Sequence, residues 1–489
     1  MLGWDFSPRL SGGVGSACQG LANALSRASE PTEVLFVLPR LRGDEEPEKV
    51  RLLSGAEESP AAPLPRAAPA EPETGPVVAS AQVPAAREPK IEPRPALPSA
   101  AEALRLLAID SPLRPYLSAR DYDEVVRKLL ARIRAETPTV VHAPEPPFRE
   151  VRLAARKSPA STPSAALRPT PRAAATAEAR GVPYGRTLDA EVERYARTAL
   201  ALVLGESGQG ESFDVIHAHD WMTFPAALLL RERTGKPLVV HFHSSEAERR
   251  GPLASQEVRA IEQAALDAAE RVVCVSEASA RTLRSHYAVE RAKVRVLHNA
   301  FSPLAEARRE ERTGPVVLFL GRLSEQKSPD VFLQAAARVA ERHPAASFVL
   351  AGEGELYPEL KALAEELGLA RCVRFTGFVS GEELARTYAG ADVYVLSSAA
   401  EPFGISALEA LSLGVPTIVP NGAGVTEVVS SVLRFAPGDD AELAEKIVGL
   451  LEHPALRSQL STAGLREVKR LRWDRPARAL RGIYDEVAH

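Results

Sequence analysis

The chain has 489 residues and a formal net charge of -4, so it is long enough for at least two domains, and its charge gives no reason to expect nucleic acid or an anionic membrane as a partner. Its three cysteines, Cys18, Cys274 and Cys372, are far apart without a Cys-x-x-Cys pair, which indicates neither a disulfide framework nor a zinc site. No long apolar run or signal-peptide pattern is present, so we expect a soluble, cytoplasmic protein without a transmembrane segment.

A glycine turn near the N-terminus is the first segment that suggests binding. Gly12, Gly13 and Gly15 follow a short apolar start, and residues 17–25 have helical spacing. A glycine turn that leads into a helix presents backbone amides that can hold an anion. A plain tight connection is the alternative. A strand is predicted next, at residues 33–39.

Two segments of the N-terminal half are predicted to be loose insertions, at about 41–100 and at 155–180. Residues 61–100 hold ten prolines and eleven alanines, which leaves too few large apolar side chains to offset the entropy lost on ordering. Between the insertions, helical spacing returns at 101–107 and 121–136.

Several strands of the N-terminal half end in polar residues. After a helix at 190–204, the strand predicted at 213–221 carries polar residues toward its end, in His217-Ala218-His219-Asp220. In open α/β sheets, ligands bind at the carboxyl ends of the strands, so His219 is a candidate hydrogen-bonding partner for a ligand. A strand at 293–297 leads to Asn299, which is either a ligand-facing residue or an ordinary turn residue.

A second half begins after a charged linker. The buried strand predicted at 315–321 is followed by Arg322 and Lys327. An arginine forks onto phosphate oxygens and a lysine adds a point charge, so this pair suits a diphosphate.

The segment after the strand at 392–396 carries two carboxylates eight residues apart, Glu401 and Glu409. Carboxylates accept hydrogen bonds from the vicinal hydroxyls of a sugar or a ribose. A helix is predicted at 405–413, and its N-terminal amides suit a phosphate. Those amides belong to Phe403, Gly404 and Ile405.

These motifs, in this order, resemble the retaining GT-B glycosyltransferases of group 1, and the opening of the chain resembles their glycogen synthase-like members. The resemblance covers nearly the whole chain outside the insertions. It implies an α/β fold with two Rossmann-like, doubly wound domains that face each other across a cleft. The implied boundaries are 1–305 for the acceptor-side domain, 314–470 for the nucleotide-sugar domain, and 471–489 for a helix that crosses back to the first domain.

The resemblance also implies roles for these residues. Glu401 would contact the donor sugar, Glu409 the ribose, and His219 would lie beside the sugar. The implied catalytic residues are His219, Glu401, Arg322 and Lys327. The implied donor-binding residues are Gly12, Gly13, Gly15, Asn299, Phe403, Gly404, Ile405 and Glu409, while Glu246 and Arg249 would lie on the acceptor side.

The implied reaction transfers a sugar, glucose from ADP- or UDP-glucose, to an acceptor hydroxyl with retention of configuration. The implied acceptor is a carbohydrate, an α-glucan as in glycogen synthesis. The alternatives are another polysaccharide, lipid or small-molecule acceptor, a nucleotide-sugar epimerase of the same fold, and a nucleotide-sugar-binding protein without catalysis.

No metal cofactor is expected. Asp121-Tyr122-Asp123 has the Asp-x-Asp pattern by which other glycosyltransferases hold a divalent ion. Here it precedes a helical pattern at 125–133, and aspartates favour a helix N-terminus because they cap free amides.

Overall fold

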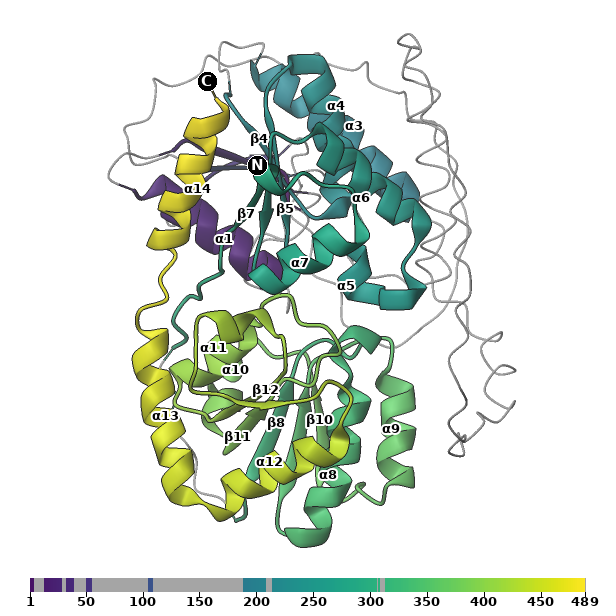
Figure 1. The fold of residues 1–489 in the computed structure, drawn as a ribbon, viewed down its shortest axis with the longest axis vertical. Coiled ribbons are helices and arrows are strands. Elements are labelled where there is room, and N and C mark those ends of the chain that lie inside the picture. Colours follow the sequence, from purple (N-terminus) through teal and green to yellow (C-terminus); the bar gives the residue numbers. More distant parts are fainter. Residues whose placement is uncertain are drawn as a thin grey trace, which may run out of the picture.

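The computed structural model describes most of the chain outside the two predicted insertions (Figure 1). The described residues are 1–3, 13–28, 32–38, 50–54, 104–108, 188–207, 213–305, 307 and 313–488. Some predictions lie outside them, namely those for Gly12, the helix at 121–136 with Asp121 and Asp123, and the insertion at 155–180.

The N-terminal half is built on parallel strands. Within the described residues, one group runs in the order β1-β3-β2 and a second in the order β4-β5-β6-β7. Leu2 joins the two groups, because it bridges both Val37 and Ala218. The strands are β1 (Val34–Leu38), β2 (Val50–Ser54), β3 (Leu104–Ala108), β4 (Ile216–His219), β5 (Leu238–Phe242), β6 (Arg271–Cys274) and β7 (Val294–Val296).

Helices cover this sheet, and therefore its central strands are buried throughout. Every residue of β4 and β5 is buried, as expected for parallel strands with helices on both faces. The helices of this half are α1 (Gly13–Ser26), α3 (Leu188–Ser207), α4 (Phe224–Thr234), α5 (Glu246–Arg250), α6 (Gln256–Ala268) and α7 (Glu277–His286).

The C-terminal half repeats this plan with a second parallel sheet, whose described strands run in the order β10-β9-β8-β11-β12-β13. They are β8 (Val316–Leu320), β9 (Ser347–Ala351), β10 (Val373–Gly377), β11 (Val393–Val395), β12 (Thr417–Pro420) and β13 (Leu433–Phe435). The helices are α8 (Pro329–Arg342), α9 (Tyr357–Glu366), α10 (Gly381–Ala389), α11 (Ile405–Ser412), α12 (Asp440–Glu452), α13 (Pro454–Val468) and α14 (Asp474–Val487). Both sheets have the doubly wound α/β order that the sequence predicted.

One predicted element is wrong. Residues 101–107 have helical spacing, but the structure forms strand β3 at Leu104–Ala108. β3 lies between β1 and β2 and pairs in parallel with both, so tertiary pairing overrides the local helical preference. β2 also lies inside the range 41–100 that was predicted to be loose.

The C-terminal helix α14 leaves its own half and packs against α1 (Figure 1). Tyr484 on α14 contacts His217, with 2.6 Å between the Tyr484 hydroxyl and His217 Nδ1. Glu486 pairs with Arg271 and Arg295 on β6 and β7. The helix therefore ties the end of the chain to the N-terminal sheet.

Close packing at Gly20 supports this arrangement. A methyl group on Gly20 of α1 would overlap the indole ring of Trp473, which precedes α14. We expect Gly20→Ala to destabilise the protein by about 1–3 kcal/mol, because the two helices would have to move apart. Urea unfolding followed by circular dichroism would measure this change.

Gly482 supplies a matched control on α14 itself. A methyl group there meets nothing within 4 Å, so Gly482→Ala should be neutral or stabilise the helix by about 0.5–1 kcal/mol. Equal destabilisation by the two substitutions would contradict the packing at Gly20.

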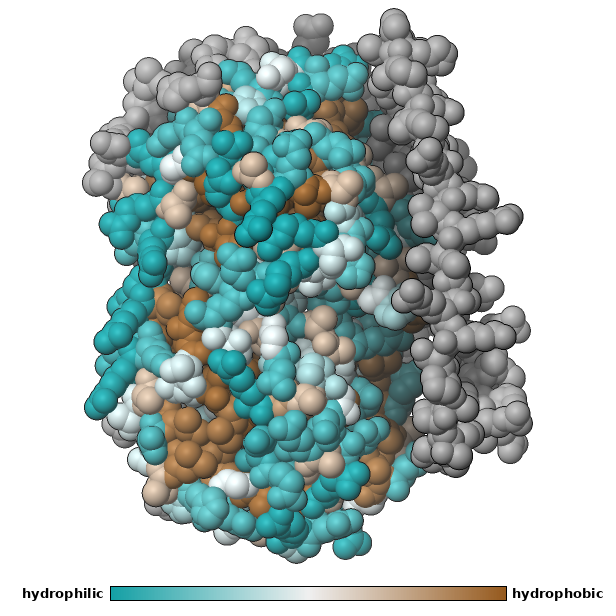
Figure 2. All heavy atoms as spheres, in the orientation of Figure 1, coloured by the Kyte–Doolittle hydropathy of each residue, from teal (hydrophilic) through white to brown (hydrophobic). Residues whose placement is uncertain are grey.

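The molecular surface differs between the halves on the face drawn in Figure 2. Hydrophilic residues cover most of the N-terminal half there, whereas hydrophobic residues gather on the C-terminal half beside α13. No helix in the described part of the chain is both long enough and apolar enough to cross a membrane.

Candidate active site

The loop between β11 and α11 positions the first predicted carboxylate. Glu401 Oε2 accepts hydrogen bonds from Lys327 Nζ at 2.6 Å and from Ser398 Oγ at 2.8 Å. Only 6% of the Glu401 side chain is exposed, so these donors hold a nearly buried carboxylate in one position. Ser398 was not predicted from the sequence, since a serine two residues after a strand has no distinctive signal.

Gly404 gives this loop its shape. It occupies the N-terminal cap of α11 with a φ of 104°, a conformation that side chains other than glycine rarely adopt. A methyl group there would also come within 3.1 Å of Leu396. The first amides of α11 have no partner inside the helix, as at any helix start, and can bind an anion.

The loop after β8 brings the predicted cations to the same place. Lys327 ends a short 3-10 helix (Glu325–Lys327), and Ser397 Oγ donates to the carbonyl groups of Lys327 and Ser328. Arg322 is half-buried in the same loop. Hydrogen bonds from Ser397 and the contact between Lys327 and Glu401 therefore connect the loop after β8 to the loop after β11.

The start of α1 faces the start of α11. A methyl group built on Gly13 would lie 3.6 Å from Ile405 Cδ1. Gly15, two residues further along α1, is buried. Two helix N-termini thus meet at the junction of the two halves, and each contributes partial positive charge. This is a favourable place for a phosphate group.

Glu409 lies on α11 and is half-buried. Its Oε2 accepts a hydrogen bond from the Tyr388 hydroxyl at 2.9 Å. Burial raises the pKa of Glu409, and the Tyr388 hydrogen bond opposes that rise. Each oxygen of an ionised carboxylate can accept hydrogen bonds from hydroxyl groups, and this holds for the second oxygen of Glu409.

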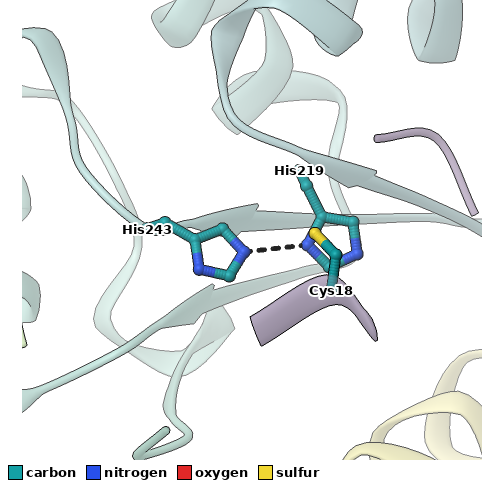
Figure 3. A group of neighbouring side chains, drawn as sticks. All are labelled: Cys18, His219 and His243. Carbon is teal, nitrogen blue, oxygen red and sulfur yellow. Dashed lines mark hydrogen bonds between the residues drawn. The ribbon is translucent and has the colours of Figure 1, made fainter. Parts of the chain in front are cut away.

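His219 ends β4 in a stack of buried histidines. His217, His219, His241 and His243 come from the neighbouring strand segments around β4 and β5, and their rings lie 4.3–5.4 Å apart by centroid. His219 Nδ1 lies 2.9 Å from His243 Nε2 (Figure 3). Burial, with the neighbouring imidazoles, lowers the pKa of His219 well below its ordinary value. The ring is therefore uncharged at physiological pH.

Other contacts cross the junction. Gln326 Nε2 donates to Ser244 Oγ in the N-terminal half and to the Ala400 carbonyl, both at 3.4 Å. Glu427 accepts from the amides of Glu277 and Ala278 at the start of α7. The spacing of Gln326 and Lys327 gave no sign that Gln326 would reach the other half.

Glu427 also binds His298, which follows β7, with 2.7 Å between His298 Nε2 and Glu427 Oε2. Burial would raise the pKa of Glu427, but the hydrogen bonds from His298 and the α7 amides lower it overall. Asn299, the next residue, is buried at this same junction.

Glu246 and Arg249, predicted for the acceptor side, lie in a buried network of charged side chains. Glu246 accepts from the Ser255 amide at 2.9 Å, and Arg249 pairs with Glu246 and with Glu262. Burial raises the pKa of Glu262 to about 7, although Arg249 opposes this. The network fixes the loop after β5, and a role for Glu246 and Arg249 at the acceptor stays a prediction.

Comparison with known proteins identifies the family. Residues 150–303 match the family model described as Glycosyltransferase Family 4, and residues 304–467 match that of the glycosyl transferases group 1. An uncharacterised glycosyltransferase of Methanocaldococcus jannaschii is 30% identical over 295 residues, which cover 56% of this chain and 75% of that protein. The chain belongs to the group 1 glycosyltransferases. This glycosyltransferase is therefore a retaining, nucleotide-sugar-dependent enzyme, as the resemblance implied.

Named relatives of the glycosyltransferase differ in what they do. The D-inositol 3-phosphate glycosyltransferase of Acidothermus cellulolyticus is 32% identical, covering 56% of this chain and 67% of that protein. The glycogen synthase of Mycobacterium tuberculosis strain H37Rv is 31% identical, covering 51% of this chain and 63% of the relative. These two relatives belong to the same family, but their names give different activities.

Solved structures agree on the fold of the glycosyltransferase. The sucrose-phosphate synthase of Thermosynechococcus elongatus superposes with a TM-score of 0.53 at 22% identity, covering 63% of this chain and 80% of that one. The Anabaena HepE protein, solved with UDP and glucose, gives a TM-score of 0.51 at 20% identity, covering 61% and 82%. These matches confirm the predicted GT-B fold.

Proposed function

We propose that this glycosyltransferase moves glucose from ADP- or UDP-glucose to the hydroxyl of a carbohydrate acceptor, an α-glucan as in glycogen synthesis. The observation that carries the proposal is the contact between Lys327 and Glu401, 2.6 Å apart, beside the facing starts of α1 and α11. A cation, two helix N-termini and a fixed carboxylate at one junction suit a diphosphate joined to a sugar.

The diphosphate is assigned to the cationic side of this junction. Lys327, Arg322 and the first amides of α1 and α11 supply positive charge without a metal ion. Negative charge develops on the departing nucleotide when the bond from the sugar to the phosphate oxygen breaks, and these groups stabilise it in the transition state. We assign residues 314–470 to the nucleotide sugar and 1–305 to the acceptor on the same reasoning.

The sugar is assigned to Glu401 and His219. Glu401 already holds Lys327 in the structure, so it accepts from sugar hydroxyls with its remaining lone pairs. His219 lies at the carboxyl end of β4, where ligands of open sheets bind, and its neutral ring offers a hydrogen bond to the hydroxymethyl end. Glu409 on α11 is assigned to the ribose.

The relatives support glucose as the sugar and a carbohydrate as the acceptor. HepE was solved with UDP-glucose, and one group of relatives is named glycogen synthase. An inositol phosphate acceptor is the second candidate, because several relatives at 29–33% identity carry that activity in their names.

Transfer assays would separate these candidates. Purified protein is incubated with ADP-glucose or UDP-glucose and either a glucan primer or inositol 3-phosphate, and the product linkage is assigned by NMR. The proposal predicts α-linked glucose on the glucan. Transfer only to inositol 3-phosphate would show that the acceptor is an inositol phosphate and not a glucan. Binding of the donor without transfer or hydrolysis would indicate a nucleotide-sugar-binding protein without catalysis.

The absence of a metal requirement is a further prediction. Transfer should proceed in EDTA without added Mg²⁺ or Mn²⁺, because the cationic groups named above neutralise the diphosphate. Asp123→Asn should be close to silent in the same assay. A strict requirement for magnesium or manganese, together with loss of transfer in Asp123→Asn, would contradict the assignment of the diphosphate site.

The first insertion is predicted to be dispensable for donor turnover. Replacing residues 61–100 with a short Gly/Ser linker leaves every motif in place. In the parallel pair β2 and β3, Ser54 and Leu104 lie at opposite strand ends, about 14 Å apart, a span that about ten flexible residues cover. Donor hydrolysis at the wild-type rate is expected. A variant that folds but no longer hydrolyses the donor would show that the insertion serves the reaction.

A further inference from the structure

The buried histidines at β4 and β5 offer more nitrogen atoms than their surroundings use. Within this stack of four histidines, five buried ring nitrogens have no hydrogen-bond partner: His217 Nε2, His219 Nε2, His241 Nδ1, His241 Nε2 and His243 Nδ1. A buried polar atom without a partner costs about 1–3 kcal/mol. So many in one stack point to a bound group that supplies the missing partners.

Strand geometry brings three of these rings to one place. His217 and His219 are two residues apart on β4, and therefore lie on the same face of the sheet. His241 on β5 is paired directly with His219 in the parallel register. One ring nitrogen from each of the three histidines lies within 4.8 Å of the others. Three imidazoles of this kind make the ligand set of a zinc site that keeps its fourth position open.

The outer contacts of two rings fit metal coordination through Nε2. Metal-bound histidines usually give their other ring N–H to a hydrogen-bond acceptor, which fixes the tautomer. His217 Nδ1 lies 2.6 Å from the Tyr484 hydroxyl, and His219 Nδ1 lies 2.9 Å from His243 Nε2. Both Nδ1 atoms are thus engaged, and both Nε2 atoms remain for an ion.

We propose that His217, His219 and His241 form a buried binding site for a transition-metal ion, Zn²⁺, with Tyr484 and His243 as outer hydrogen-bond partners. Zn–N bonds of about 2.0–2.1 Å require small rotations of the rings. The C-terminal helix α14 contributes to the site, because it carries Tyr484. The ion is separate from the diphosphate, which the cations beyond the junction neutralise.

A second group of possible ligands shares His219. Cys18, His219 and His243 also place one ligand atom each within 4.8 Å of the others (Figure 3). An ion there would bind two rings that already contact each other, those of His219 and His243, and would leave the unpartnered nitrogens of His217 and His241 as they are. The site formed by His217, His219 and His241 therefore accounts for more of the unpartnered ring nitrogens than the site with Cys18 does.

Zinc at this site would compete with the donor sugar. This consequence rests on the proposed function, in which the His219 ring offers a hydrogen bond to the sugar. Micromolar Zn²⁺ should then inhibit transfer, and EDTA should restore it. Metal binding itself is measured without donor or acceptor, so the test of the zinc site does not depend on the proposed transfer reaction.

The test uses the full chain without a polyhistidine tag. The protein is treated with chelator, incubated with Zn²⁺, passed through a desalting column and analysed for metal. About one zinc per chain is expected for the wild type, with at least a tenfold loss of affinity in His217→Gln and His241→Gln. His286→Gln, which changes an exposed histidine on α7, and Cys18→Ser should bind as the wild type does.

Cobalt separates the two ligand groups in the unaltered protein, even if a variant fails to fold. Co²⁺ bound by histidines alone gives visible tetrahedral bands without a thiolate charge-transfer band. That band, or loss of zinc in Cys18→Ser but not in His241→Gln, would move the ion to Cys18 and overturn the proposal. So would a wild type that retains no zinc, or folded histidine variants that retain it fully.

Discussion

Glu401→Gln is expected to lower the transfer rate at least about a hundredfold, roughly 3 kcal/mol in transition-state stabilisation. The substitution keeps the size of the side chain but removes the charge that holds Lys327 Nζ at 2.6 Å. In the proposed function it also removes an acceptor for the sugar hydroxyls. Initial rates at saturating donor and acceptor would measure the loss.

The fold should tolerate this change. Glutamine still accepts from Ser398 Oγ, so the melting temperature should fall by only a few degrees. Glu366→Gln, on an exposed part of α9, is the control for losing one negative charge and should keep wild-type turnover. A Glu401→Gln enzyme with near-wild-type transfer would remove Glu401 from the site.

The elements around Glu401 could be predicted because their signals are local. Apolar spacing predicted a helix at 405–413, and α11 spans Ile405–Ser412. Gly414, two residues after the last residue of α11, has a φ of 74°, which suits a glycine after a helix. The loops that carry Arg322, Lys327 and Glu401 follow strands whose apolar runs are equally plain.

Contacts between distant segments could not be predicted in this way. β3 forms because β1 and β2 flank it, and nothing in residues 101–107 records that pairing. The histidine site likewise depends on the register of β4 against β5, which sets His241 beside His219. The cysteine spacing says nothing about these histidines, because a sheet brings together residues that are far apart along the chain.

Lys327→Ala is expected to lower kcat/KM for the donor by about 10²–10³, the cost of removing one preorganised group that stabilises transition-state charge. It should also lower the melting temperature more than Glu401→Gln does. The reason is that Glu401, with 6% of its side chain exposed, would keep its charge and lose its cation, and an unpaired buried charge is destabilising. Lys361→Ala, on the exposed face of α9, is the matched control.

The double variant tests whether the two side chains act as a unit. Groups in direct contact that serve one substrate are not additive, so Glu401→Gln with Lys327→Ala should lose about 10³-fold and not the product of the single losses. Its melting temperature should exceed that of Lys327→Ala alone, because glutamine leaves no buried charge behind. Additive losses in rate, or a double variant less stable than both single ones, would mean that the contact between Lys327 and Glu401 has no part in holding the donor.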